Sequence, residues 1–208
     1  HKIPARIFLT FTFFLIFFGG SLVSVKQANA TAVIVVHTTV DQLDGSPGNG
    51  KCSLREAIMN ANLNNGNQAD CTPGTPGMDI IELKAATYTL TRGGVDEDDN
   101  ATGDLDIRES LTINGVSSDL TIIQAGTTSP GIDRVLDIHQ SPDPGTTVII
   151  NNITIQHGKA PDGGDDAKGS SGEGVNNQGY LTLNDCIVRD NQAGDGGLGK
   201  SGQGGKGG

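Results

Sequence analysis

The chain has 208 residues, 24 of them acidic and 14 basic, which gives a formal net charge of −10. That length suits one domain of ordinary size. Because the charge is strongly negative, nucleic acid and anionic membrane surfaces are poor partners for this protein. The sequence starts at His1 rather than at a methionine and stops within a run of glycines, so we expect a fragment of a longer reading frame, with more missing beyond Gly208 than before His1.

Residues 1–30 have the features of a secretory leader. Lys2 and Arg6 are basic, Ile7–Phe18 is apolar, and Ala28–Ala30 is a small-residue cleavage site. The apolar run is shorter than the ~20 residues that a membrane span needs, although an uncleaved anchor is the alternative. Removal of the leader takes away three basic residues and no acidic one, so the charge of the exported chain becomes −13 (11 basic against 24 acidic).

The stretch Lys51–Asn62, KCSLREAIMNAN, predicts a capped amphipathic helix over Cys52–Asn65. Ser53 and Glu56 fit the S-x-x-E capping box, and Asn65 with Gly66 is a usual helix ending. Apolar residues recur at i, i+3, i+4 and i+7 and form one helical face: Leu54, Ala57, Ile58 and Ala61. Arg55 is then a charge on a helix and not half of an acid–base pair.

Two of the three cysteines are predicted to form a disulfide, and the third is predicted to be free. Cys52 and Cys71 flank the predicted helix, and export permits disulfides, so we expect them to be paired. Closing a loop of this size is worth about 3 kcal/mol in the chain-entropy model. Cys186 lies in an apolar strand pattern and is predicted to be a small buried residue.

Short apolar strands make up most of the remaining chain. Single strands are predicted over Ala32–Val36, Asp79–Leu83 and Thr87–Leu90. Three groups of three follow: Leu105–Ile107, Leu111–Asn114, Leu120–Ile123; Val135–Ile138, Val148–Asn151, Ile153–Ile155; Gly174–Asn177, Leu181–Asn184, Cys186–Val188. Corresponding positions recur every 31 to 37 residues, as from Leu105 to Leu136 and from Leu111 to Val148. This repeat predicts an all-β solenoid with three short strands per turn rather than a β-sandwich.

Two further features fit a solenoid. Asn114, Asn151 and Asn184 each follow the middle strand of a group, so we predict a structural asparagine ladder. The Gly- and Asp-rich segment Gly158–Glu173 is expected to project from one side.

An acidic stretch is the candidate metal site. Asp98, Asp99, Asp104 and Asp106 could supply oxygen ligands to calcium, and a solvated acidic loop is the alternative. No EF-hand spacing is present.

Several residues could take part in catalysis, but their spacing in the sequence matches no known catalytic pattern. A lyase or glycosidase needs clustered carboxylates, or a carboxylate pair, on a cleft wall. The residues on or beside strands are Asp106, Asp137, Asp185, Arg108, Arg134, Arg189, His139 and His157. No spacing singles out a pair, so we predict outward surface positions for all of them and no catalytic residue.

Two local motifs carry little weight. Gly194–Ser201 matches G-x-x-x-x-G-K-S, but a P-loop needs a helix after it, and the glycine-dense sequence that follows cannot hold one. We therefore predict a flexible glycine-rich loop and no nucleotide. The sequons at Asn100 and Asn152 are interpreted as chance matches.

The lead motif CSLREAI with the following AN resembles the CSLREA-domain family of exported bacterial proteins. Asp79–Ile107, DRVLDI and LTLNDCIVRDNQA are also similar to that family, whose β-helical repeats resemble those of polymorphic outer-membrane proteins. The resemblance implies a right-handed parallel β-helix of the pectin-lyase type, export, and often a C-terminal surface anchor. It implies no settled activity and brings no catalytic residues. In such a fold the helix would be a lid over the first turn.

We therefore expect a secreted or outer-membrane, surface-displayed β-helical protein with a structural or adhesin-like role. The expected partners are cell-surface glycans or proteins of a host or neighbouring cell, with the membrane reached only through an anchor outside this sequence. The alternatives are a polysaccharide lyase or glycoside hydrolase with catalytic turns beyond Gly208, and a calcium-dependent binding module. The expected divisions are a signal peptide over 1–30, a cap with the helix and first strands over 31–92, β-helix turns over 93–193, and a glycine-rich linker over 194–208.

Overall fold

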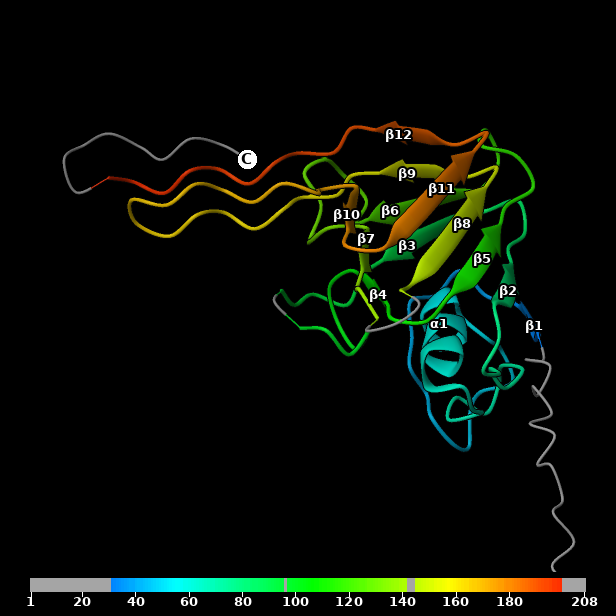
Figure 1. Cartoon of the computed structure of the whole chain (residues 1–208). Helices are drawn as coiled ribbons and strands as arrows, with labels where there is room; N and C mark the ends of the chain where they lie inside the picture. The colour runs from blue at the N-terminus through cyan, green and yellow to red at the C-terminus, as the bar shows by residue number, and fades with distance from the viewer. Residues whose placement is uncertain (1–30, 96, 142–144, 200–208) are drawn as a thin grey trace, which may run out of the picture.

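The described part of the chain, residues 31–95, 97–141 and 145–199 of a computed structural model, forms a parallel β-solenoid of about three turns. The predicted leader lies outside these residues. One short helix, α1 (Leu54–Leu63), sits at the N-terminal end of the stack of strands (Figure 1). The predicted parallel β-helix with an N-terminal helix is therefore confirmed.

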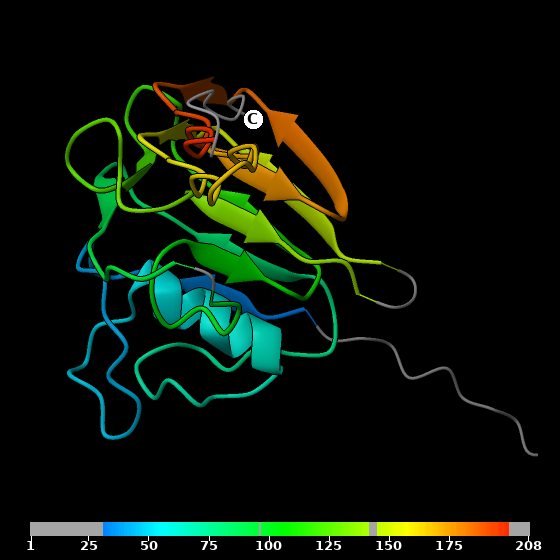
Figure 2. The ribbon, with the colours of Figure 1, turned by 90° about the vertical axis from the view of Figure 1, so that its left-hand side faces the viewer.

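Within the described residues all strand pairs are parallel, and the strands form three sheets that run along the stack (Figures 1 and 2). The first sheet is β1 (Val33–Val35), β2 (Asp79–Glu82), β5 (Leu111–Asn114), β8 (Thr147–Asn151) and β11 (Tyr180–Asn184). The second is β4 (Leu105–Ile107), β7 (Leu136–Ile138) and β10 (Val175–Asn177). The third is β3 (Thr87–Leu90), β6 (Ile122–Ala125), β9 (Thr154–Gln156) and β12 (Ile187–Arg189). Parallel pairing thus begins with β1 on β2, within the segment expected to be the cap.

Aliphatic side chains fill the interior in register. Leu111 pairs with Val148, and Ile113 with Ile150, and all four are fully buried. Because successive strand residues point to opposite faces, the residues between them point outward. The same positions stack from turn to turn and build a core of aliphatic side chains.

The asparagine ladder is present and starts one turn earlier than expected. Asn151 donates to Oδ1 of Asn114, and Asn184 to Oδ1 of Asn151, each at 2.7 Å. Asn114 in turn donates to Glu82 at 2.8 Å. A second ladder, not foreseen from the sequence, runs along the third sheet, where Gln156 donates to Gln124 at 2.7 Å.

The third strand of each group begins later than predicted. In the first group it is Ile122–Ala125 and not Leu120–Ile123. Leu120 is exposed, and its N–H donates to the carbonyl of Ser117 in a turn. The buried pair is therefore Ile123 and Ala125, and Gln124 between them faces outward into the second ladder.

Helix α1 has the predicted capping box but a different end. The Ser53 hydroxyl accepts from the N–H of Glu56 at 3.2 Å, and the Glu56 carboxylate accepts from the N–H of Ser53 at 2.9 Å. The helix ends at Leu63, with Asn64 in the left-handed region at φ 51°, and not at Asn65. Asparagine tolerates this conformation, so Gly66 is not needed as the C-cap.

Two helix side chains complete the outer edge of β4. Asn62 donates to the carbonyl of Asp106 at 2.7 Å and accepts from the N–H of Arg108 at 2.9 Å. Arg55, seven residues earlier, donates to the carbonyls of Gly103 and Asp104 at 2.8 and 2.7 Å. Because β7 pairs with the other edge of β4, the helix satisfies the edge that a preceding turn of the solenoid would otherwise pair, which is how a lid works.

A disulfide joins Cys52 to Cys71, as predicted, and ties the start of the helix to the loop that follows it. Cys186 is a free thiol that lies just before β12 and is only partly buried. It packs against the core from the last described turn rather than within it.

Long connections leave the solenoid at one corner. They link the third strand of one turn to the first strand of the next, over residues 91–104, 126–135 and 157–174, and we name them the corner loops. Figure 1 shows them on the same side of the molecule. The prediction that Gly158–Glu173 projects from one side is confirmed, and the other two long connections share its origin.

The third corner loop pairs with the chain after β12 to form an extended arm, here called the glycine arm (158–173 with 190–199; Figure 1). The N–H groups of Ala160, Gly163 and Asp166 donate to the carbonyls of Gln192, Asp195 and Leu198, one bond every three residues. In the opposite direction, the N–H groups of Gly194 and Gly197 donate to the carbonyls of Ser170 and Ala167. A three-residue period is that of extended polyproline II-like chains, which pack closely only where glycine faces a neighbour. Over 194–199 the chain is therefore hydrogen-bonded along the arm, and the rest of the predicted glycine-rich linker, 200–208, lies outside the described residues.

Candidate functional site

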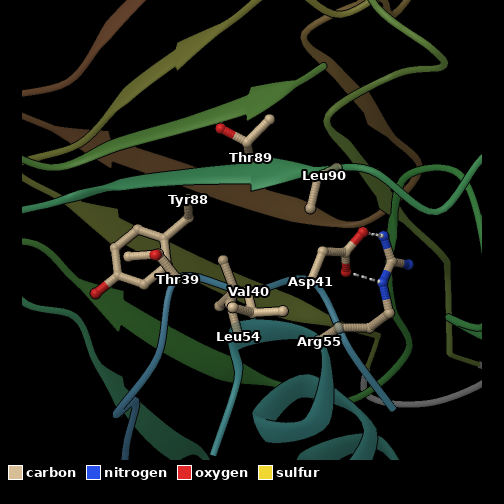
Figure 3. Close-up of a pocket in the computed structure, with 8 residues that line it drawn as sticks. All are labelled: Thr39, Val40, Asp41, Leu54, Arg55, Tyr88, Thr89 and Leu90. Carbon is tan, nitrogen blue, oxygen red and sulfur yellow. Dashed lines mark hydrogen bonds and ion pairs between the residues drawn. The ribbon is translucent and has the colours of Figure 1, made fainter. Parts of the chain in front are cut away.

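The charged residues of the CSLREA stretch build structure. Arg55 forms two hydrogen bonds with the carboxylate of Asp41, from Nε at 2.6 Å and Nη2 at 3.2 Å (Figure 3). Both side chains are almost completely buried. Burial alone would raise the pKa of Asp41, but the hydrogen bond and charge of Arg55 and the N–H groups of Thr91 and Arg92 lower it below its usual value. The cavity beside the pair is about 10 Å³, enough for one water at most.

The second sheet carries a ladder of polar residues at its centre. Asp106 of β4, Asp137 of β7 and Asn176 of β10 lie in register. Asn176 donates to both carboxylate oxygens of Asp137, at 3.0 and 3.1 Å. Strands β4 and β7 both read Leu-Asp-Ile, with two aliphatics around one polar residue, whereas β10 reads Val-Asn-Asn. The central polar residues of the three strands stack in register.

Asp106 is nevertheless fully buried, so its predicted surface position is wrong. The first corner loop covers it, and the N–H of Asn100 donates to its Oδ2 at 2.9 Å. On the other side, Nε2 of His139 lies 2.8 Å from Oδ1. The surface position predicted for His139 is also wrong, because its side chain is only 20% exposed and lies against Asp106. Burial raises the pKa of Asp106, although the hydrogen bond from His139 acts in the opposite direction.

Further carboxylates surround this ladder. Asp104, Asp133 and Asp137 are all buried, so the predicted surface position of Asp137 is wrong. Burial raises the pKa of Asp104 to about 8, and the charges of Asp133, Asp106 and Asp137 act in the same direction. Arg134 lies 3.9 Å from Asp137 and partly offsets the negative charge. The cluster is rich in carboxylates and poor in cations.

The four predicted calcium ligands do not all lie at one site. Asp98 lies beside Asp106 and His139, and ligand atoms of these three residues are within 4.8 Å of one another. Asp99 turns to Arg108 instead, at 3.2 Å. Asp104 belongs to the buried carboxylate group with Asp133. The residue that sequence reasoning left out is His139, which reaches the site through the stacking of β7 on β4.

The remaining catalytic candidates are not gathered at this cluster. Asp185 lies in the turn between β11 and β12, and Arg189 ends β12 in the third sheet. His157 follows β9, and its buried Nδ1 has no hydrogen-bond partner among the described residues. These residues form no carboxylate pair with the second sheet.

A groove crosses the three corner loops. Its cavity is about 430 Å³ and is lined by Val95, Gly131, Ile132, Lys159, Ala160, Pro161 and Asp162. Each corner loop contributes to this lining, and Lys159 pairs with Asp162 at 3.0 Å. Volumes of this order are typical of ligand-binding clefts.

The two local motifs have no functional context. Gly194 lies in the glycine arm, while Lys200 and Ser201 of the G-x-x-x-x-G-K-S match lie outside the described residues. The side chain of Asn100 is buried and bonds the carbonyl of Arg55 at 2.9 Å, so this sequon is closed in the folded chain. Asn152 is half-buried in the turn after β8.

Among the described residues, no helix is both long enough and apolar enough to span a bilayer. No family model, curated protein or solved structure was found to match the chain.

Proposed function

We propose that this chain is part of an exported bacterial surface protein, related to the CSLREA-domain family, that uses the corner loops to bind a protein partner. The groove of about 430 Å³ across three successive corner loops is the observation that carries the proposal. A solenoid repeats its corners at fixed spacing, so loops from distant parts of the sequence build one continuous face. The resemblance of the lead motif supports the exported, surface-displayed setting.

The lining of the groove favours a protein over a sugar. Val95, Ile132, Ala160 and Pro161 contribute apolar side chains to its lining, and the Lys159–Asp162 pair contributes two charged groups. No aromatic side chain lines it within the described residues, whereas sugar-binding clefts commonly offer aromatic faces. A mixture of apolar and charged groups is usual for a protein-binding surface.

A matched pair of valines tests the groove. Val95 and Val116 are almost equally exposed, at 55% and 56%, but only Val95 lines the groove. Beads coated with the protein are tested for adhesion to intact bacterial and host cells, before and after protease treatment of the cells. We expect protease-sensitive adhesion that Val95→Asp abolishes and Val116→Asp preserves.

Two results would contradict the proposal. Adhesion that survives protease and is lost after glycosidase treatment would identify a glycan partner. Equal effects of the two valine substitutions would show that the groove is not the binding face. Fractionation of the producing cells tests the setting separately, since we expect the protein in the envelope and not in the cytoplasm.

A further inference from the structure

We infer that Asp98, Asp106 and His139 form a binding site for one divalent transition-metal ion of the Zn²⁺ type. Their ligand atoms lie within 4.8 Å of one another, although the residues come from the first corner loop, from β4 and from the chain just after β7. This set differs from an acidic surface patch, because it combines a fully buried carboxylate and an imidazole nitrogen.

One pair of ligand atoms already has a spacing that suits a metal with short bonds, and the exposed Asp98 side chain would close in on the ion from within 4.8 Å. Oδ1 of Asp106 and Nε2 of His139 are 2.8 Å apart. Two ligands at zinc distances of about 2.0–2.1 Å in a tetrahedron are about 3.3 Å apart. The imidazole therefore needs to move by only about half an ångström to admit the ion, which then replaces the proton between the two atoms.

Surrounding groups hold the ligands in place. Asn100 fixes the second oxygen of Asp106 at 2.9 Å, which leaves Oδ1 facing His139. Asp137 lies 3.9 Å from the same imidazole nitrogen and is itself held by Asn176. Partners of this kind orient metal ligands and commonly change affinity by about 10–100-fold when removed.

Charge also favours a cation here. Asp137 adds negative charge 3.9 Å from His139, and the nearby Arg134 offsets only part of it. Calcium and magnesium prefer sets made only of oxygen, whereas imidazole suits zinc and its neighbours. The exposed Asp98 closes one side, and a fourth position stays open to water or to a group from outside.

Isothermal titration of Zn²⁺ into the chelator-treated full chain tests the site, with Ca²⁺ titrated in parallel. We expect one Zn²⁺ per chain, and a loss of affinity of about 10-fold or more in Asp98→Asn and in His139→Gln. Asp99→Asn is the matched control: Asp99 adjoins Asp98 and is exposed, but it pairs with Arg108, so affinity should change by less than about 3-fold. Co²⁺ in place of zinc should give a four-coordinate ligand-field spectrum that His139→Gln alters.

Three outcomes would overturn the inference. They are the absence of zinc binding, binding that neither Asp98→Asn nor His139→Gln weakens, and calcium binding that depends on Asp98 but not on His139. Circular dichroism shows whether each variant is folded. Asp98→Asn keeps the test valid if His139→Gln unfolds, because Asp98 is exposed.

Discussion

Arg55 and Asp41 form a bidentate ion pair that is closed to solvent and joins the lid helix to the loop before it. The same guanidinium reaches the carbonyls of Gly103 and Asp104, so one side chain connects the lid to the edge of β4.

Removing either partner of the Arg55–Asp41 pair leaves a buried charge without compensation, which typically destabilises a protein by about 3–5 kcal/mol. We therefore expect Arg55→Met to lower the free energy of unfolding by that order, as measured with urea. Arg108→Met, which breaks an exposed pair with Asp99, should change it by less than about 1 kcal/mol. If Arg55→Met and Arg108→Met lowered the free energy of unfolding equally, the buried pair would contribute no more to stability than the exposed one.

The role of Arg55 marks a limit of sequence reasoning. The capping box and the apolar face of the helix are local patterns, and both were predictable from adjacent residues. The asparagine ladder was predictable because the repeat fixes which residues stack. Arg55 was assigned only as a helix charge, because its carbonyl partners lie 48 and 49 residues away along the chain. Its seven-residue spacing from Asn62 was the one available signal that both share a helical face.

The acidic cluster shows the same limit in another form. Strand alternation correctly placed Asp106 on the outer face of β4, yet the residue is buried because the first corner loop folds over it. The alternation of apolar and polar residues predicts the strands, but it does not predict the path of the loops between them. His139 was likewise invisible as a partner, since only the stacking of consecutive turns brings it to Asp106.

Asp104 should make stability depend on pH. Its pKa is raised from the ordinary value of 3.8 to about 8 in the folded state, so between these values the folded chain holds a proton that the unfolded chain has lost. Stability therefore falls as pH rises through this window. Asp104→Asn should stabilise the protein at about pH 8 by on the order of a few kcal/mol and change little near pH 4. Urea denaturation at both pH values measures this, and an equal effect at each pH would refute it.

The lid should contribute through its covalent and capping bonds. Cys52→Ser opens the disulfide to Cys71, which spans 19 residues, and should lower the unfolding free energy by about 3 kcal/mol. Ser53→Ala removes the N-cap acceptor and should lower it by about 1 kcal/mol. Cys186→Ser is the control, because that thiol is free and only partly buried. Thermal melts in which Cys52→Ser and Ser53→Ala match the parent would contradict a stabilising lid.

The asparagine ladder should be strongest at its centre. Asn151 donates to Asn114 and accepts from Asn184, whereas Asn184 has only one ladder bond among the described residues. Each bond contributes about 1 kcal/mol, so Asn151→Ala should destabilise by roughly twice as much as Asn184→Ala. Chemical denaturation of both variants gives the ratio. A larger loss for Asn184→Ala would show that the ladder does not act as a chain of equivalent bonds.

The glycine arm should depend on particular glycines. A methyl group at Gly169 would collide with the carbonyl oxygen of Gly194, whereas one at Gly164 would meet open space. Gly169→Ala should therefore separate the chains of the arm, and Gly164→Ala should not. Hydrogen exchange at Gly194 and Gly197, whose N–H groups are bonded within the arm, reports the difference. Protection that is unchanged in Gly169→Ala would mean that the arm does not need close packing.

Because the glycine arm is held by backbone hydrogen bonds and the solenoid by aliphatic burial, the two parts should respond differently to temperature. Exposure of apolar surface gives unfolding its large positive heat-capacity change, while exposure of peptide groups lowers that change. Unfolding of the arm should therefore add almost no heat capacity, and its stability should vary nearly linearly with temperature. The solenoid, in contrast, should have a curved stability profile with a maximum near or below room temperature. One chain thus combines an element stabilised by water exclusion with one whose persistence is largely independent of the hydrophobic effect.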